Sequence, residues 1–317
     1  MTMRVGILGL GLMGQRMLEA IDHHPEFESV VGFDPDLARA REVATKYRFD
    51  VTETEEDLFA VSDLDLVYIA SPPRHHVPSA WNALNREVPI FVEKPLAVDL
   101  EEAQTWVNEV ENRQHPVAVN FPFATLPGFQ QICRECSVES NQPLQRVEIL
   151  LHFSHWPRTW HHAGPWLSGP LEGGFLREVF SHFLFLTHRV CGPTRVKSVQ
   201  LERDRETGVE SSVVATLIAG ETPVTLIGAV GGAAPDYNRW SAIGSETSYR
   251  LTDWGRVEVT DGSTWSEVPA ESGETRGLEG QLDQLARLVE GKDHRLATAR
   301  EALEVAQAVE SLLSEGN

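Results

Sequence analysis

Residues 3–14 read MRVGILGLGLMG, an apolar run that ends in three glycines spaced as Gly9-x-Gly11-x-x-Gly14. The run has the branched apolar residues of a strand, and the stretch that follows, Met13–His23, has helical spacing. In such a unit the first glycine permits a tight turn, the second lets the backbone approach a pyrophosphate, and the third lets helix and strand pack closely. N–H groups at the helix start, at Leu12 and Met13, add a positive dipole end. The stretch predicts a turn that binds a dinucleotide.

An acid follows at the place where such a unit needs one. Asp34 closes the second predicted strand, twenty residues after the last glycine, where a carboxylate accepts hydrogen bonds from the adenosine ribose. A 2′-phosphate there would meet like charge from Asp34 and Asp36. The nearest cations are Arg39 and Arg41. We therefore expect NAD as the cofactor, with NADP as the alternative.

Short apolar runs alternate with helical stretches through the first 120 residues. Continuous apolar strands separated by helices imply a parallel sheet that is covered on both faces. We therefore predict a doubly wound α/β Rossmann domain over residues 1–120. The predicted strands are Arg4–Leu8, Ser29–Phe33, Leu66–Ala70, Pro89–Val92 and Pro116–Val119, and the predicted helices are Met13–His23, Leu37–Lys46, 75–86 and 99–112.

The pattern changes after Asn120, and residues 121–317 are predicted to form an α+β domain for substrate binding and oligomerisation. Gly220-Glu221 and Gly244-Ser245 separate neighbouring strand candidates as hairpin turns do, which indicates a largely antiparallel open sheet. One face of that sheet takes helices, and an apolar second face would need a partner. The predicted strands are 147–153, 195–202, 209–219, 222–231, 238–243 and 247–251, with helices at Phe129–Ser137 and, in two pieces, Leu278–Leu313.

Lys94 stands in Val92-Glu93-Lys94-Pro95-Leu96, at the end of a predicted strand. Ligands of open α/β sheets bind outside the carboxyl ends of the strands, so Lys94 lies where a nicotinamide and its substrate meet. An ammonium there can hydrogen-bond a substrate oxygen and stabilise negative charge while a hydride leaves or arrives. The alternative is a lysine that pairs with a carboxylate at a strand end.

A second candidate pair lies in the other domain. Apolar residues recur at threes and fours from Leu176 to Val190, which predicts a helix that ends at Gly192-Pro193. Glu178 and His182 then share one face, a single turn apart. The acid can orient the imidazole and raise its basicity, which suits a general base. From these residues alone, a local Glu–His hydrogen bond that only supports the helix competes with this interpretation.

Taken in order, these motifs resemble the glucose–fructose oxidoreductase/inositol dehydrogenase (Gfo/Idh/MocA) family. The resemblance also rests on Ser71-Pro72 with His76 four residues later, and on the pair Gly173-Gly174 followed by an acid and a histidine at steps of four. It implies a catalytic lysine at Lys94, a general base at His182 with Glu178 beside it, and a sheet-mediated homodimer or homotetramer. The cofactor contacts that it implies are Gly9, Gly11, Gly14, Asp34, Ser71, Pro72, His76, Glu93 and Lys94.

Three departures from the family pattern concern the substrate. The acid is usually an aspartate and here is Glu178, and the bulky Phe180 replaces a small residue. The segment that begins at Asn120 reads Asn-Phe-Pro-Phe and lacks the arginine of a glycine-aromatic-Asn-Arg segment. We expect Asn120 and Trp160 to contact substrate, with Trp160 in a tryptophan-rich stretch that either lines the pocket or only packs.

Composition excludes several classes of function. The net charge of −20, with no Lys/Arg cluster, argues against nucleic-acid and membrane partners. Three cysteines are too few for a disulfide framework, so we expect a soluble, cytoplasmic protein. We expect no metal, because His152 and His155 point to opposite faces of a strand. Cys133-x-x-Cys136 lies inside a predicted helix, which argues against a redox role.

The sequence thus predicts an NAD(P)-dependent oxidoreductase. It would transfer a hydride between nicotinamide and a secondary alcohol or carbonyl of a sugar-like or polyol-like small molecule. One alternative is a dinucleotide-binding sensor without catalysis on the same scaffold, and another is an NAD(P)H-dependent C=N reductase.

Overall fold

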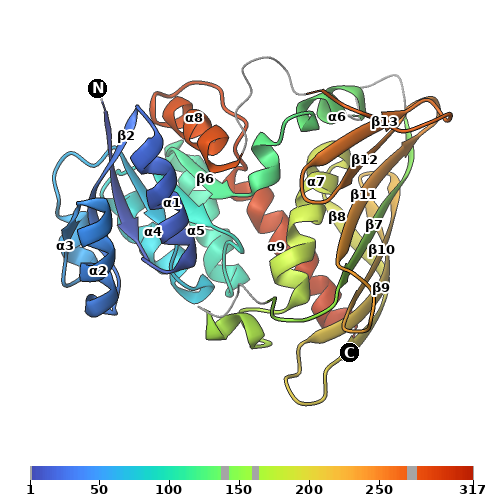
Figure 1. Cartoon of the computed structure of the whole chain (residues 1–317), viewed down its shortest axis with the longest axis horizontal. Helices are drawn as coiled ribbons and strands as arrows, with labels where there is room; N and C mark the ends of the chain where they lie inside the picture. The colour runs from blue at the N-terminus through green and yellow to red at the C-terminus, as the bar shows by residue number, and fades with distance from the viewer. Residues whose placement is uncertain (1, 137–142, 159–163, 270–276, 317) are drawn as a thin grey trace. The chain divides into compact units, whose positions relative to one another are not determined.

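A computed structural model describes residues 2–136, 143–158, 164–269 and 277–316. The chain forms two compact units (Figure 1). The first unit comprises Met1–Thr125 with Thr275–Leu303, and the second comprises Leu126–Glu274 with Glu304–Asn317. The sequence analysis divided the chain once, after residue 120, whereas the structure returns the segment 275–303 to the first unit.

The first unit is built on a six-stranded parallel sheet in the order β3-β2-β1-β4-β5-β6. The order reverses between β1 and β4, so crossovers on either side of that point run in opposite directions along the sheet and place helices on both faces. This confirms the predicted doubly wound fold. The strands are β1 Met3–Leu8, β2 Phe27–Phe33, β3 Asp50–Val51, β4 Leu66–Ile69, β5 Ile90–Glu93 and β6 Val117–Asn120, and the helices are α1 Leu12–His23, α2 Leu37–Tyr47, α3 Glu55–Phe59, α4 His76–Asn85 and α5 Leu100–Arg113.

Helix α8 (Gly277–Val289) explains why a late segment belongs to the first unit. Its apolar side chains Leu282 and Leu285 are fully buried in the cluster that holds Ile7 and Phe91 of the parallel sheet. The chain then runs beside β6, where the Val119 N–H donates to the Ala297 carbonyl over 2.9 Å. The spacing of leucines predicted a packing face, but it carries no information about which core that face joins.

The second unit holds an eight-stranded sheet in the order β14-β13-β12-β11-β7-β10-β9-β8. Neighbouring strands are antiparallel except for the parallel pair of β7 and β10, so the predicted, largely antiparallel sheet is confirmed. The strands are β7 Leu144–Phe153, β8 Thr194–Arg203, β9 Glu210–Ala219, β10 Thr222–Val230, β11 Tyr237–Gly244, β12 Ser248–Thr252, β13 Arg256–Thr260 and β14 Ser266–Glu267, and the helices are α6 Phe129–Cys136 and α7 Ser181–Cys191. Helix α9 (Ala299–Glu315) contributes its later part to this unit.

Within the described ranges, no helix combines the length and the apolar character that crossing a bilayer requires.

Candidate functional site

The turn from β1 into α1 leaves no space for side chains at two of its three glycines. Gly9 has φ +95°, and a Cβ on it would lie 2.6 Å from the backbone of Ala70 at the end of β4. A Cβ on Gly14 would lie 2.0 Å from the Gly9 carbonyl oxygen. A Cβ on Gly11, in contrast, would meet no atom within 4 Å. Strand β1 and helix α1 are therefore locked together, and the backbone at Gly11 faces open space.

This open space fits the pyrophosphate of a dinucleotide. Helix α1 begins at Leu12 and Met13 without a side-chain cap, so its first N–H groups are not used by a capping side chain. At the end of the neighbouring strand β4, the Ser71 hydroxyl oxygen is buried and has no hydrogen-bond partner among the residues that the structure describes. Pro72 follows it and leads into the turn Pro73–His75. The residues predicted to line the cofactor thus meet at the point where the strand order reverses.

Asp34 is held rigidly at the end of β2 and is 5% exposed. One carboxylate oxygen accepts the Leu10 N–H and the other accepts the Asp36 N–H, both over 2.9 Å. The Arg39 guanidinium lies 3.5 Å from Asp34 and 3.3 Å from Asp36. The ribose acid predicted from the sequence is therefore oriented by backbone donors, and a cation already offsets part of its charge.

His76, at the start of α4, joins the Ser71 segment to the segment after Lys94. Its Nδ1 lies 2.8 Å from the Pro95 carbonyl oxygen and its Nε2 lies 2.7 Å from the Ser71 carbonyl oxygen. Burial lowers the pKa of His76 to about 4, although both carbonyl contacts oppose that shift. A neutral ring carries one N–H, so it donates to only one of these two carbonyl oxygens, and it lies between two segments predicted to contact the cofactor.

Lys94 is half-buried and follows β5, where Glu93 and Asn120, two of the predicted ligand contacts, belong to a buried polar cluster. The Glu93 carboxylate accepts the Tyr68 hydroxyl, the Asn120 amide over 2.6 Å, and the Lys94 backbone N–H over 3.3 Å. The side-chain oxygen of Asn120 accepts a hydrogen bond from the side-chain amide of Gln281 over 2.5 Å. Glu93 and Asn120 are predicted to contact cofactor and substrate. In the structure their side chains form hydrogen bonds to each other and to neighbouring residues. Neither Tyr68 nor Gln281 carried a sequence signal.

In the second unit, the segment that carries Glu178 and His182 differs from its prediction. Leu176–Phe180 is a π-helical turn, and only from Ser181 does the chain continue as the α-helix α7. The Ser181 N–H donates to the Leu176 carbonyl, five residues back. Single π turns inside helices are frequent at functional sites. Glu178 is 8% exposed, and His182 is half-buried.

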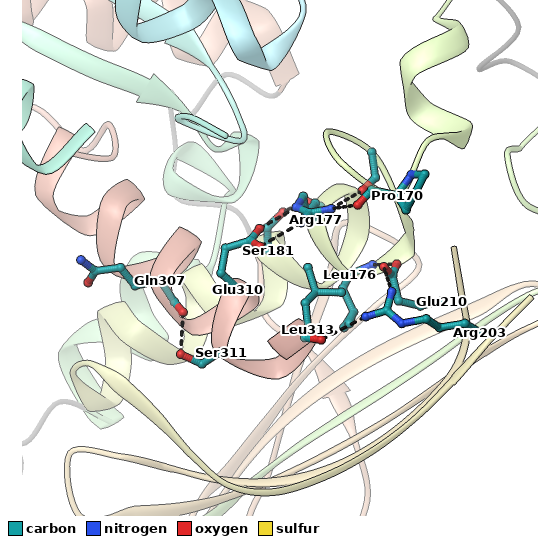
Figure 2. A network of polar contacts seen from close by, with 11 residues as sticks. Pro170, Leu176, Arg177, Ser181, Arg203, Glu210, Gln307, Glu310, Ser311 and Leu313 are labelled. Atoms are coloured by element: carbon teal, nitrogen blue, oxygen red, sulfur yellow. Dashed lines mark hydrogen bonds and ion pairs between the residues drawn. The ribbon is translucent and has the colours of Figure 1, made fainter. Parts of the chain in front are cut away.

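Figure 2 shows how the π-helical turn is held by a late part of the chain. The Arg177 guanidinium donates to both carboxylate oxygens of Glu310 in α9, over 2.5 and 2.8 Å. It also donates to the carbonyl oxygens of Pro170 and Gly173, over 2.7 and 3.0 Å. A bidentate arginine of this kind fixes direction as well as distance. The turn therefore depends on a contact that spans 133 residues of sequence.

Glu210 holds the other side of the same turn (Figure 2). Its carboxylate accepts the Leu176 N–H over 3.3 Å and lies 3.4 Å from Arg203. Gly174 has φ +105°, and a Cβ there would lie 2.6 Å from a Glu210 oxygen. The second glycine of the predicted Gly-Gly pair is thus required both by its backbone angle and by this carboxylate.

A cavity of about 320 Å³ lies in the second unit, and Trp254 in its wall also contacts His182. The Trp254 and His182 rings meet edge to face with centroids 6.0 Å apart. The Arg158 guanidinium carbon lies 4.8 Å from the centre of the Phe153 ring and 5.1 Å from that of Trp254. Hydrogen bonds from Ser154 lower the pKa of the Asp236 carboxyl in the same wall. Sequence analysis missed this wall, because its residues come from separate strand ends and loops.

Trp254 adopts an uncommon backbone conformation for a bulky residue. Its φ is +63°, and that of Asp253 is +51°. The backbone N–H of Trp254 donates to the Asn238 side-chain oxygen over 3.0 Å, which helps to hold the turn. Strained residues of this kind cluster at ligand sites, where the surrounding structure enforces them.

The remaining predictions concern residues with no place in these clusters. Trp160, the second expected substrate contact, lies outside the described residues. In the described part of the chain, no group of three or more His, Cys, Asp or Glu side chains is arranged to hold a metal ion. Cys133 and Cys136 form no disulfide, and burial raises the pKa of Cys136 to about 12, which disfavours the reactive thiolate.

Gly14 and Gly11 predict separable effects on folding and on cofactor binding. Gly14→Ala should destabilise the protein by at least about 2 kcal/mol, because its methyl group would overlap the Gly9 carbonyl. Gly11→Ala should leave the melting temperature unchanged and weaken NADH binding roughly tenfold or more, because its methyl group points into the proposed pyrophosphate space. Calorimetric melting and NADH titration measure both effects. Wild-type NADH affinity in Gly11→Ala would contradict this assignment.

His76 predicts a pH dependence of stability. Because its folded pKa is lowered to about 4, protons bind the unfolded chain first as pH falls below the unfolded value of about 6.5. The stability contributed by neutral His76 is full above that value and is lost as pH falls toward about 4. Relative to His76→Gln, the wild type should lose about 2 kcal/mol more between about pH 7 and about pH 5 in urea titrations. The exposed neighbour variant His75→Gln should track the wild type, and a parallel decline in His76→Gln would refute the assignment.

Comparison with known proteins agrees with this geometry. Residues 3–121 match the family model described as an oxidoreductase family with an NAD-binding Rossmann fold. An inositol 2-dehydrogenase of Saccharopolyspora erythraea is 32% identical over 157 residues, which is 48% of this chain and 45% of that protein. An uncharacterised oxidoreductase of Synechocystis is 25% identical over 204 residues, or 63% of this chain and 54% of that protein. The matched stretch thus spans about half the length of these curated relatives.

Solved structures resemble the fold over the whole chain. An oxidoreductase from Agrobacterium radiobacter, in complex with NAD⁺, L-tartaric acid and magnesium, has a TM-score of 0.83 at 17% identity, covering 100% of this chain and 96% of that one. A 3-ketoreductase from Actinomadura kijaniata, in complex with NADP and TDP-benzene, has a TM-score of 0.81 at 17% identity, covering 99% and 98%. Residues 3–121 of the chain thus resemble the NAD-binding Rossmann fold of the Gfo/Idh/MocA oxidoreductase family.

Proposed function

We propose that this chain is an NAD(P)-dependent dehydrogenase or reductase that acts on a secondary alcohol or carbonyl group of a sugar-like or polyol-like molecule. The observation that carries the proposal is the place of Lys94. It follows β5, next to the strand whose end forms the Ser71 segment, at the same sheet edge as the open glycine turn. Ligands of open α/β sheets bind at this edge, so Lys94 brings a cation to the place where a reacting oxygen would bind.

Each candidate residue has one task in the proposed reaction. When bound, NAD(P) supplies or accepts the hydride at C4 of its nicotinamide ring. Lys94 donates a hydrogen bond to the substrate oxygen and stabilises negative charge that develops on it. His182 takes the hydroxyl proton in oxidation and returns it in reduction, and Glu178 orients the imidazole. The roles of His182 and Glu178 rest on their spacing after Gly173-Gly174, which resembles the family pattern.

The cavity beside Trp254 supports a hydroxylated substrate. Its wall combines an aromatic ring with Arg158, Asp236 and Asn238, whose planar polar groups suit pairs of neighbouring hydroxyls. The Asp236 carboxyl has a lowered pKa, so it accepts hydrogen bonds as an anion. The relatives named as inositol 2-dehydrogenases agree with a polyol, although they match only about half their length.

The homodimer or homotetramer expected through the sheet of the second unit stays a prediction. Val214 and Ile227 lie opposite each other on β9 and β10 and are 45% and 40% exposed. An exposed apolar pair on a sheet face is consistent with a second copy covering it.

Lys94→Ala tests the proposed chemistry. A panel of polyols, sugars and cyclic ketones, assayed in both directions with both cofactors by NAD(P)H absorbance, first identifies a substrate. Lys94→Ala should then lower kcat by roughly a thousandfold while NADH affinity persists, because the variant loses charge stabilisation and keeps the glycine turn. The exposed α2 variant Lys46→Ala should behave as the wild type. A fully active Lys94→Ala enzyme would contradict the proposal, and failure of the whole panel despite tight NADH binding would favour a sensor.

Arg39 predicts a change in cofactor preference. Its guanidinium is the cation that contacts both Asp34 and Asp36, so Arg39→Gln leaves their charge less compensated. Binding of NADPH should weaken roughly fivefold more than binding of NADH, as expected for a partly exposed charge. Fluorescence titration with both nucleotides measures this ratio, and Arg41→Gln is the matched control. An unchanged ratio of NADPH to NADH affinity in Arg39→Gln would show that Arg39 does not contribute to binding at the ribose site.

A further inference from the structure

A chain of four buried polar side chains runs through the first unit below Lys94. Tyr68, Glu93, Asn120 and Gln281 are 1%, 7%, 1% and 0% exposed. They come from β4, β5, β6 and α8, so that α8 reaches the three strand ends from a distant part of the sequence. Each hydrogen bond in the chain is donated toward Glu93: Tyr68 and Asn120 donate to its carboxylate, and Gln281 donates to Asn120. This direction suits an ionised carboxylate, which only accepts.

A contribution to folding stability does not explain why these four polar side chains are buried together. A buried carboxylate loses its hydration, and well-packed apolar residues of similar volume are often as stable or more stable. The Gln281 carbonyl oxygen, moreover, is buried without a hydrogen-bond partner in the described part of the chain. The adjoining core contains apolar residues that include Phe91, Leu282 and Leu285. A costly polar chain inside such a core calls for a function.

This series of hydrogen-bonded side chains reaches the backbone of Lys94. The Lys94 backbone N–H donates to the second Glu93 oxygen, so the carboxylate fixes the backbone from which the lysine side chain extends. The Lys94 charge also reaches the carboxylate: burial raises the pKa of Glu93, while the hydrogen bond from Tyr68 and the charge of Lys94 lower it. The same lysine charge helps to lower the pKa of His76, after the larger effect of burial. Tyr68 and Lys94 are thus the titratable groups that act on Glu93, with His76 acted on by the same lysine.

We propose that Glu93 is a positioning residue for Lys94. Its ionised carboxylate, held by Tyr68 and Asn120 and supported through Asn120 by Gln281 of α8, fixes the Lys94 backbone and supplies a negative counter-charge to the lysine. This inference rests on the proposed function, in which the Lys94 ammonium contacts the substrate oxygen. It reassigns Glu93 and Asn120 from ligand contacts to supports of the lysine.

Competitive labelling of the folded protein tests the proposal without a substrate. Acetic anhydride modifies neutral amines, and mass spectrometry reports the labelling of Lys94 against the exposed Lys197 at a series of pH values. In Glu93→Gln, which keeps the shape and removes the charge, labelling of Lys94 should rise severalfold at a given pH, because the lysine loses its counter-charge. Tyr68→Phe and Gln281→Met should produce smaller rises. Ser79→Ala, which removes another buried hydroxyl of the same unit, should cause none.

Activity supplies a second readout once the panel has identified a substrate. In the pH profile of kcat, the acid limb should shift to higher pH in Tyr68→Phe. The hydrogen bond from Tyr68 lowers the pKa of Glu93, so its loss raises that pKa. In Glu93→Gln that limb should disappear and kcat should fall roughly tenfold or more, with KM changed less. A merely structural role would move neither the labelling nor the limb.

The outcomes separate this inference from the proposed function. If Lys94→Ala is inactive while Glu93→Gln and Tyr68→Phe leave Lys94 labelling unchanged, the positioning role is wrong and the catalytic lysine stands. If Lys94→Ala is fully active, the proposed function fails whatever the labelling shows. Should Glu93→Gln not fold, Tyr68→Phe and Gln281→Met decide, and wild-type labelling in both would overturn the inference.

Discussion

At Gly9 and Gly14 there is no room for a methyl group, and the architecture of the first unit depends on this constraint. It lets the end of β1 lie against the end of β4 and lets α1 start close to the strand. The strand order reverses at that point, so the open backbone of Gly11 and the Ser71 hydroxyl lie at one edge of the sheet. Lys94 leaves the neighbouring strand β5 at the same edge. The proposed cofactor site and the proposed catalytic Lys94 thus lie at a sheet edge that the packing at these two glycines shapes.

Two polar devices then stabilise the loops at this edge. Burial keeps the His76 ring neutral, so it donates to one of the two carbonyl oxygens that it contacts, and the Glu93 carboxylate accepts hydrogen bonds from three donors. Both place titratable groups inside an apolar unit, where an unmade hydrogen bond costs about 1–3 kcal/mol. Such a cost is tolerated where it fixes reactive groups, because positions correct to a fraction of an ångström determine rates.

The sequence predicted most of the strands and helices, because apolar residues recur every two residues in strands and about every 3.6 residues in helices, and both patterns can be found in a short stretch of sequence. It predicted the cofactor edge for the same reason: strand, glycines, helix and Asp34 follow one another in order. It did not predict that α8 joins the first unit, since an apolar stripe does not specify its partner. The π-helical turn was also missed, because it depends on Arg177 meeting Glu310 far along the chain. Asn120 was expected to contact substrate from its family position, but its bonds to Glu93 and Gln281 arise only from the folded sheet and helix.

A crystal structure of the protein with NADH tests the central claim most directly, namely that the glycine turn and Lys94 serve one nicotinamide cofactor. The account predicts a pyrophosphate against the backbone of Gly11 and the first N–H groups of α1, the adenosine ribose at Asp34, and C4 of the nicotinamide facing the side of Lys94. A dinucleotide bound elsewhere, or a nicotinamide whose C4 faces away from Lys94, would contradict it.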